Sequence, residues 1–108
     1  MKNEEGGSYV TLRYGFTKGE RMSSYHLKAN DEAPLVEPEG ETWTLDELQE
    51  LVGGYIEIVA APNHPGRVLV INEDGKLKGL PFNKNATDLY IYEPIVGDAV
   101  ITMKELIE

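Results

Sequence analysis

Two adjacent carboxylates, Glu73 and Asp74, follow Asn72 directly and could serve as cation ligands or as a general base. The spacing of an EF-hand loop is missing, because the acids do not alternate and no Glu closes the run. Asn-Glu-Asp-Gly also favours a tight turn, since Asn and Asp side chains hydrogen-bond to their own backbone. We therefore interpret residues 72–75 as a hairpin turn and predict no metal site there.

The histidines and serines carry no recognisable catalytic pattern. The only histidines, His26 and His64, lie far apart in a chain without cysteine, whereas zinc sites need clustered ligands. No serine lies between the glycines of a nucleophile elbow. We therefore predict no metal or cofactor and favour a non-enzymatic role, with an enzyme as the less favoured alternative.

Polar side chains in the second half of the chain form a second candidate group. Amides, hydroxyls and carboxylates in loops above a sheet can line a small-molecule pocket, and a nearby Arg would suit an anionic ligand. The same residue types cap helices and loops, so both interpretations stay open. The predicted ligand-binding residues are Arg67, Asn83, Asn85, Thr87 and Asp98.

The net charge of −9 comes almost entirely from one segment. Residues 31–50 hold 8 of the 19 acids and contain no Lys or Arg. Such a segment would repel nucleic-acid phosphates, so we predict no nucleic-acid binding. It is either a solvated face or a surface for a basic protein partner. The predicted partner-binding residues are Glu37, Glu39, Glu41, Asp46, Glu47 and Glu50.

A helix over residues 44–53 has the strongest local signals of any element. Thr44 is the expected N-cap, and Glu47 three residues later completes a capping box. Gly53 suits a left-handed C-cap and lies at the wrong end of the helix for a phosphate loop. The side chains expected on the buried face are Leu45, Leu48, Leu51 and Val52.

The other apolar runs predict short strands and one further helical turn. The predicted strands are 9–16, 23–29, 35–36, 55–60, 67–72, a return arm at 76–79 and 99–101, with a helical turn at 83–89. Residues 1–7 are expected to form a flexible tail. We predict a single α+β domain over residues 8–108: a curved, mainly antiparallel sheet of five to seven short strands, packed on one main helix and closed in part into a barrel.

No targeting or membrane segment is apparent. The N-terminus lacks the apolar core of a signal peptide, and no apolar run approaches the roughly 18 residues of a membrane span. We therefore expect a cytoplasmic protein that does not bind membranes.

Five short motifs follow one another in a characteristic order between residues 45 and 101. They are Leu48-Gln-Glu-Leu-Val-Gly-Gly-Tyr-Ile-Glu, Val70-Ile-Asn-Glu-Asp-Gly-Lys-Leu, Gly79-Leu-Pro-Phe-Asn, Ala86-Thr87 and Ile95-Val-Gly-Asp-Ala-Val-Ile. In this order they resemble the "domain of unknown function 3846" family of small bacterial and phage proteins. Residues 45–103 would be the family-like core, and residues 8–30, an expected N-terminal hairpin, depart from the family pattern.

The resemblance implies a small intracellular protein of a phage or mobile element and brings no established activity, cofactor or catalytic residue. Together with the acidic segment, it favours a non-enzymatic accessory protein that binds a host protein. The alternative is a protein that binds a nucleotide or signalling metabolite.

Overall fold

The computed structural model of the chain describes residues 23–107, so the predicted tail at 1–7 and the predicted strand at 9–16 lie outside the described residues. Within this range the chain forms five strands, two α-helices and a short 3-10 helix. In chain order these are β1 (Ser24–Leu27), β2 (Leu35–Val36), α2 (Leu45–Val52), β3 (Ile56–Ala60), β4 (Arg67–Asn72), α3 (Lys84–Tyr90), β5 (Ala99–Met103) and η2 (Lys104–Leu106).

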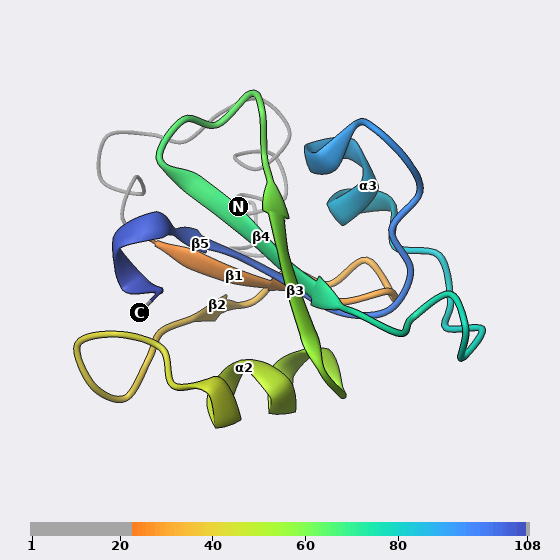
Figure 1. The fold of residues 1–108 in the computed structure, drawn as a ribbon. Helices are drawn as coiled ribbons and strands as arrows, with labels where there is room; N and C mark the ends of the chain where they lie inside the picture. Colours follow the sequence, from red (N-terminus) through yellow and green to blue (C-terminus); the bar gives the residue numbers. More distant parts are fainter. Residues whose placement is uncertain (1–22, 108) are drawn as a thin grey trace, which may run out of the picture.

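All five strands belong to one antiparallel sheet in the order β2-β1-β5-β4-β3. The last strand in the sequence, β5, therefore inserts between β1 and β4 in the middle of the sheet (Figure 1). The order ends at β2 on one side and at β3 on the other. The predicted antiparallel α+β class is confirmed, whereas the described residues form an open sheet and not a partly closed barrel.

Each face of the sheet is covered by one helix. Leu48 and Val52 of α2 pack against Val70 and Val100 on one face, together with Trp43. On the other face, Ala86 and Leu89 of α3 pack in a core with Tyr25, Leu27, Leu69, Ala99 and Ile101. Figure 1 shows α2 below the sheet and α3 above it. The helical turn predicted at 83–89 forms as α3, so the sheet packs on two helices and not on one main helix.

The predicted caps of α2 are confirmed. The Thr44 side chain accepts a hydrogen bond from the backbone of Glu47, the Glu47 side chain accepts one from the backbone of Thr44, and Gly53 is left-handed at φ 82°. The predicted buried face needs one correction, because Leu45 is 58% exposed. Trp43, only 4% exposed, fills the core beside the first turn of the helix instead.

The predicted hairpin return arm at 76–79 is wrong. The turn itself forms, since Asn72 Oδ1 accepts the backbone N–H of Asp74 at 2.9 Å. The chain then continues through further turns to Gly79, and Leu77 is 89% exposed. A returning strand has no place beside β4, because β3 and β5 already pair with its two sides.

β1 confirms the strand predicted within residues 23–29, and it pairs with β2 and β5. Its predicted hairpin partner, residues 9–16, lies outside the described range. A second hairpin joins β3 and β4 through residues 61–66, in the register that sets Ile58 opposite Val70. Both strands are rich in β-branched residues, which suit a sheet covered on both faces.

Candidate functional site

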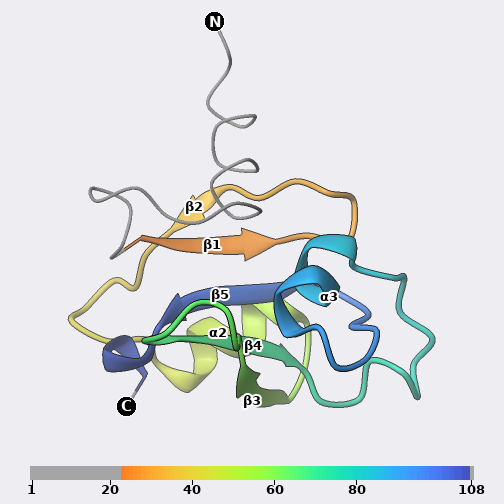
Figure 2. The ribbon, with the colours of Figure 1, turned by 90° about the horizontal axis from the view of Figure 1, so that it is seen from above.

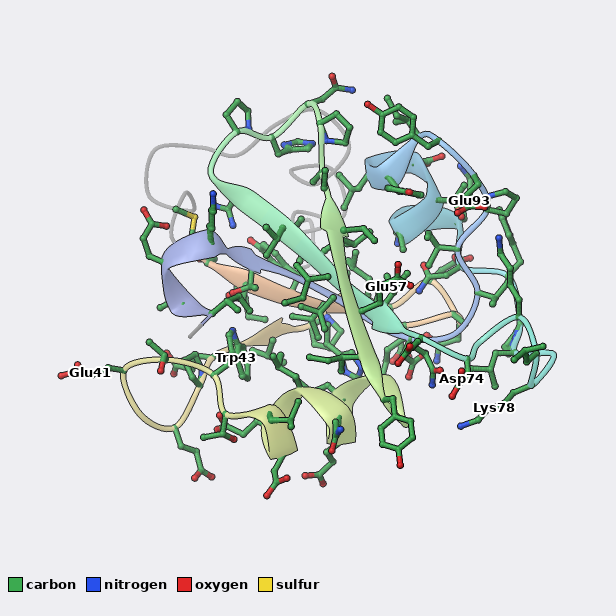
Figure 3. All side chains as sticks on the ribbon, in the orientation of Figure 1. Glu41, Trp43, Glu57, Asp74, Lys78 and Glu93 are labelled. Atoms are coloured by element: carbon green, nitrogen blue, oxygen red, sulfur yellow. The ribbon has the colours of Figure 1, made fainter. Side chains whose placement is uncertain are left out.

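The predicted acidic residues are concentrated on α2 and on the loop before it. Five of them, hereafter the acidic surface, are exposed and form no ion pair within residues 23–107. The acidic surface consists of Glu37, Glu39, Glu41, Asp46 and Glu50. Figure 3 shows Glu41 at the outer end of the loop, pointing away from the body of the molecule.

Glu47, predicted to belong with them, uses its carboxylate inside the protein. Oε1 accepts the backbone N–H of Thr44 at 2.8 Å, and Oε2 accepts the backbone N–H of Glu39 at 2.9 Å. These hydrogen bonds, from Thr44 first and then Glu39, lower the pKa of Glu47 because they stabilise its charged form. Glu47 therefore fastens the loop to the helix in addition to capping it.

Trp43 fixes the other end of the same loop. Its backbone N–H donates to Leu106 O at 2.8 Å, and its indole Nε1 donates to Thr102 Oγ1 at 2.9 Å. Thr102 Oγ1 is also 2.7 Å from Ser24 Oγ, so β1 and β5 share this buried polar contact. In Figure 3 Trp43 turns toward the sheet, whereas Glu41 points outward. Glu41 thus lies between two anchored points, Glu39 and Trp43.

The predicted ligand-binding residues do not form one site. Arg67 is at the start of β4, and its Nη1 donates to Ser23 O at 2.6 Å, just before β1. Asn83 Nδ2 donates to Leu27 O at 2.8 Å, at the opposite end of β1. The length of β1 therefore separates Arg67, the only predicted cation, from Asn83.

Asn83 itself has a structural role. Its Oδ1 accepts the backbone N–H of Ala86 at 3.0 Å, which caps α3, and its Nδ2 donates to both Leu27 O and Gly97 O at 2.8 Å. The side chain is fully buried and joins α3, β1 and the segment just before β5. The capping interpretation, left open by the sequence, describes this residue.

Thr87 and Asp98 also contact their own backbone surroundings. Thr87 Oγ1 accepts the N–H of Ile95 at 2.8 Å, and Asp98 Oδ1 accepts the N–H of Ala29 at 2.9 Å. Asn85 differs, because its buried Nδ2 has no hydrogen-bond partner. Among the predicted ligand-binding residues, only Asn85 has a buried polar group without a hydrogen-bond partner.

His26 and Asn72 complete the C-terminus of α2, a role that the sequence did not predict for either residue. His26 Nε2 donates to Leu51 O at 2.8 Å, and Asn72 Nδ2 donates to Val52 O at 3.1 Å. The last carbonyls of a helix have no hydrogen-bond donors within the helix. Here the side chains of His26 in β1 and Asn72 in β4 are the donors. Asp98 Oδ2 lies 3.7 Å from His26 Nε2 on the same side. No sequence signal marks these contacts, because they join residues distant along the chain.

A pocket of about 180 Å³ lies on the side of the molecule away from the acidic loop. Its charged lining consists of three carboxylates, Glu57, Glu73 and Glu93, and one ammonium group, Lys76, which pairs with Glu93 at 2.9 Å. None of the predicted ligand-binding residues lines it. This volume is below the roughly 300–1,000 Å³ of typical small-molecule sites, and an excess of carboxylates disfavours the predicted anionic ligand.

The sequence was compared with models of known protein families, with curated proteins and with solved structures. A family model described as "Domain of unknown function (DUF3846)" matches residues 25–105. The chain belongs to this family. The match begins in β1 and ends in η2, so the family-like region extends further toward the N-terminus than the predicted core at 45–103. No curated protein and no solved structure matches the chain.

The DUF3846 match covers Asn72, Asn83 and Gly53, whose contacts build the fold, and it assigns no activity. Among residues 23–107, no group of three or more His, Asp or Glu side chains is arranged to hold a metal ion. In the same range, no helix has the length and apolar character needed to cross a membrane.

Proposed function

We propose that the chain is a non-enzymatic accessory protein of a phage or mobile element that binds a basic host protein in the cytoplasm. The acidic surface on α2 and its preceding loop would be the binding site. The observation that carries the proposal is segregation of charge: residues 31–50 contain acids without Lys or Arg, and the acidic surface is exposed.

Uncompensated charge on one side of a protein favours association with an oppositely charged surface. Its field attracts a basic partner over about 8–10 Å at physiological ionic strength and raises the association rate. Carboxylates already paired with Lys or Arg would contribute little to such a field. The acidic surface has no such pairs within the described residues.

The loop that carries Glu37, Glu39 and Glu41 also has a defined geometry. Glu47 holds the backbone of Glu39, and Trp43 holds the loop end in the core. A surface ordered before binding loses less conformational entropy when a partner docks. This supports a role in recognition over that of a mere solvated face.

The proposal is tested by neutralising the three loop acids together. We expect the triple variant Glu37→Gln, Glu39→Gln and Glu41→Gln to capture much less host protein from a lysate than the unmodified chain. Captured proteins should be basic, and capture should fall as salt rises. Glu47 is left unchanged because its substitution would disturb the helix cap.

The matched control changes net charge equally at another place. The triple variant Glu73→Gln, Glu93→Gln and Glu105→Gln should retain full capture. Equal loss in both variants would show a nonspecific charge effect, and unchanged capture by the loop variant would reject the acidic surface as the binding site. Circular dichroism on both variants verifies that they are folded.

A further inference from the structure

The outer edge of β3 presents unpaired backbone groups. Glu73 donates its N–H to Tyr55 O at 2.8 Å, which fixes the alternation of hydrogen-bonded pairs between β4 and β3. The N–H and C=O groups of Ile56, Ile58 and Ala60 therefore point away from β4. Within residues 23–107 no strand lies on that side, and Figure 2 shows β3 at the end of the sheet opposite β2.

The sequence of β3 contains neither the Lys nor the Pro that commonly protects an edge strand against pairing. Natural edge strands are commonly blocked by Lys, Pro, bulges or a covering loop. β3 has the sequence Ile-Glu-Ile-Val-Ala, with Glu57 as its only charged residue. Ile58 is 44% exposed, and Tyr55, just before the strand, is 65% exposed. Exposed apolar side chains and unpaired backbone groups thus occur together along β3.

We propose that β3 pairs antiparallel with β3 of a second copy of the chain, across a two-fold axis at Ile58. This arrangement joins the two sheets into one continuous sheet. It sets Ile58 opposite its own copy and Ile56 opposite Ala60, so every outward backbone N–H and C=O meets a partner. A two-fold axis perpendicular to the sheet necessarily makes the paired strands antiparallel, and the interface is then closed.

The alternative registers are less favourable. A register that sets even-numbered residues of one β3 opposite odd-numbered residues of the other would leave outward backbone groups without partners. The groups opposite them would already be hydrogen-bonded to β4. Centring the axis on Glu57 would bring two carboxylates directly opposite each other, which destabilises a sheet. Centring it on Val59 would set Ile56 opposite Pro62, which has no N–H to donate. Of these registers, only the one centred on Ile58 satisfies the backbone without opposing like charges.

Electrostatic repulsion between the two copies limits the affinity of the dimer. Each copy carries a net charge of −9, which opposes association, but the excess lies in residues 31–50 and not on β3. In the Ile58 register Glu57 lies opposite Val59, so no pair of like charges is buried. Salt screens long-range repulsion more than it affects apolar or backbone contacts. The dimer should therefore become tighter as ionic strength rises, opposite to the salt dependence expected for a basic partner.

Sedimentation velocity on the full chain tests whether the dimer exists. The mass should rise from 12.0 kDa toward twice that value as concentration increases, and more readily at high salt. Ile58→Lys, which sets two ammonium groups opposite each other, should leave only monomer. Leu77→Lys, at a site that is 89% exposed, should dimerise like the unmodified chain. A monomer at all concentrations, or an Ile58→Lys dimer, would overturn the proposal.

Single cysteines test the register, since the chain has no cysteine of its own. Opposed residues of a hydrogen-bonded pair have Cα atoms about 5.5 Å apart, within the roughly 4.4–6.8 Å range of disulfides. Ile58→Cys should therefore cross-link under mild oxidation. The two Glu57 positions would be roughly 8 Å apart, so Glu57→Cys should cross-link far more slowly. Equal or faster cross-linking at 57 would rule out this register.

Discussion

Glu47 accepts a hydrogen bond from the backbone N–H of Glu39 at 2.9 Å, across eight residues of chain. The other oxygen of the same carboxylate accepts the N–H of Thr44. A residue expected to contact a partner thus serves to position its neighbours. The acidic surface and the fold are linked through this one side chain.

We expect Glu47→Gln to reduce the loss of stability at acid pH. The folded-state pKa of Glu47 is lowered from its ordinary value of 4.5, so its stabilising contribution is complete above that value. The contribution is lost as pH falls through the folded pKa. Urea unfolding measured from about pH 6 to pH 3 should show a shallower acid limb for the variant. Glu50→Gln is the control, and the same change there would contradict a specific role for Glu47.

Asn83, the N-cap of α3, has a side-chain amide that forms hydrogen bonds, whereas the buried Nδ2 of Asn85 in the first turn forms none. The two residues can therefore be compared directly. Asn83→Ala would leave Leu27 O, Gly97 O and Ala86 N without their partner, which should cost roughly 2–4 kcal/mol of unfolding free energy. Asn85→Ala removes a buried Nδ2 that has no partner, so its effect should stay within about 1 kcal/mol. Chemical denaturation measures both. Equal losses would show that packing, not hydrogen bonding, determines the importance of Asn83.

His64 should make the protein less stable as pH falls below neutrality. Burial, and secondarily the positive charge of Arg67, lower the pKa of His64 below its ordinary value of 6.5. The unfolded chain then takes up a proton more readily than the folded one. Stability is complete above about pH 6.5 and declines as pH falls from there to the folded pKa. We expect His64→Gln to flatten this part of a thermal-unfolding profile, and an unchanged slope would assign it to another group.

Nucleotides should not stabilise the protein. Arg67 and Asn83 contact opposite ends of β1, so one anion cannot bind both, and three of the four charged residues that line the pocket are carboxylates. Thermal-shift screening against a nucleotide panel provides the test, because a ligand at 100 times its Kd adds about 2.7 kcal/mol. A reproducible shift of that size would restore the small-molecule alternative. Loss of the shift in Arg67→Lys would then locate the site.

The sequence by itself determined the features that depend on neighbours along the chain. The capping box of α2, its glycine C-cap and the Asn72 turn follow from contacts a few residues apart, as does the strand character of β3 and β4. The ordered motifs identified the family, and the distribution of acids located the acidic surface. These signals are local, so one sequence suffices to recognise them.

Only the tertiary structure decided the strand order and the roles of the polar side chains. β5 occupies the side of β4 that the predicted return arm at 76–79 would have needed. Asn83 joins Leu27 across 56 residues, His26 joins Leu51 across 25, and Asn72 joins Val52 across 20. A buried polar group takes whichever partner the packed fold brings within hydrogen-bonding distance, and residue type alone does not specify that partner. For this reason the predicted ligand residues proved to be largely parts of the framework.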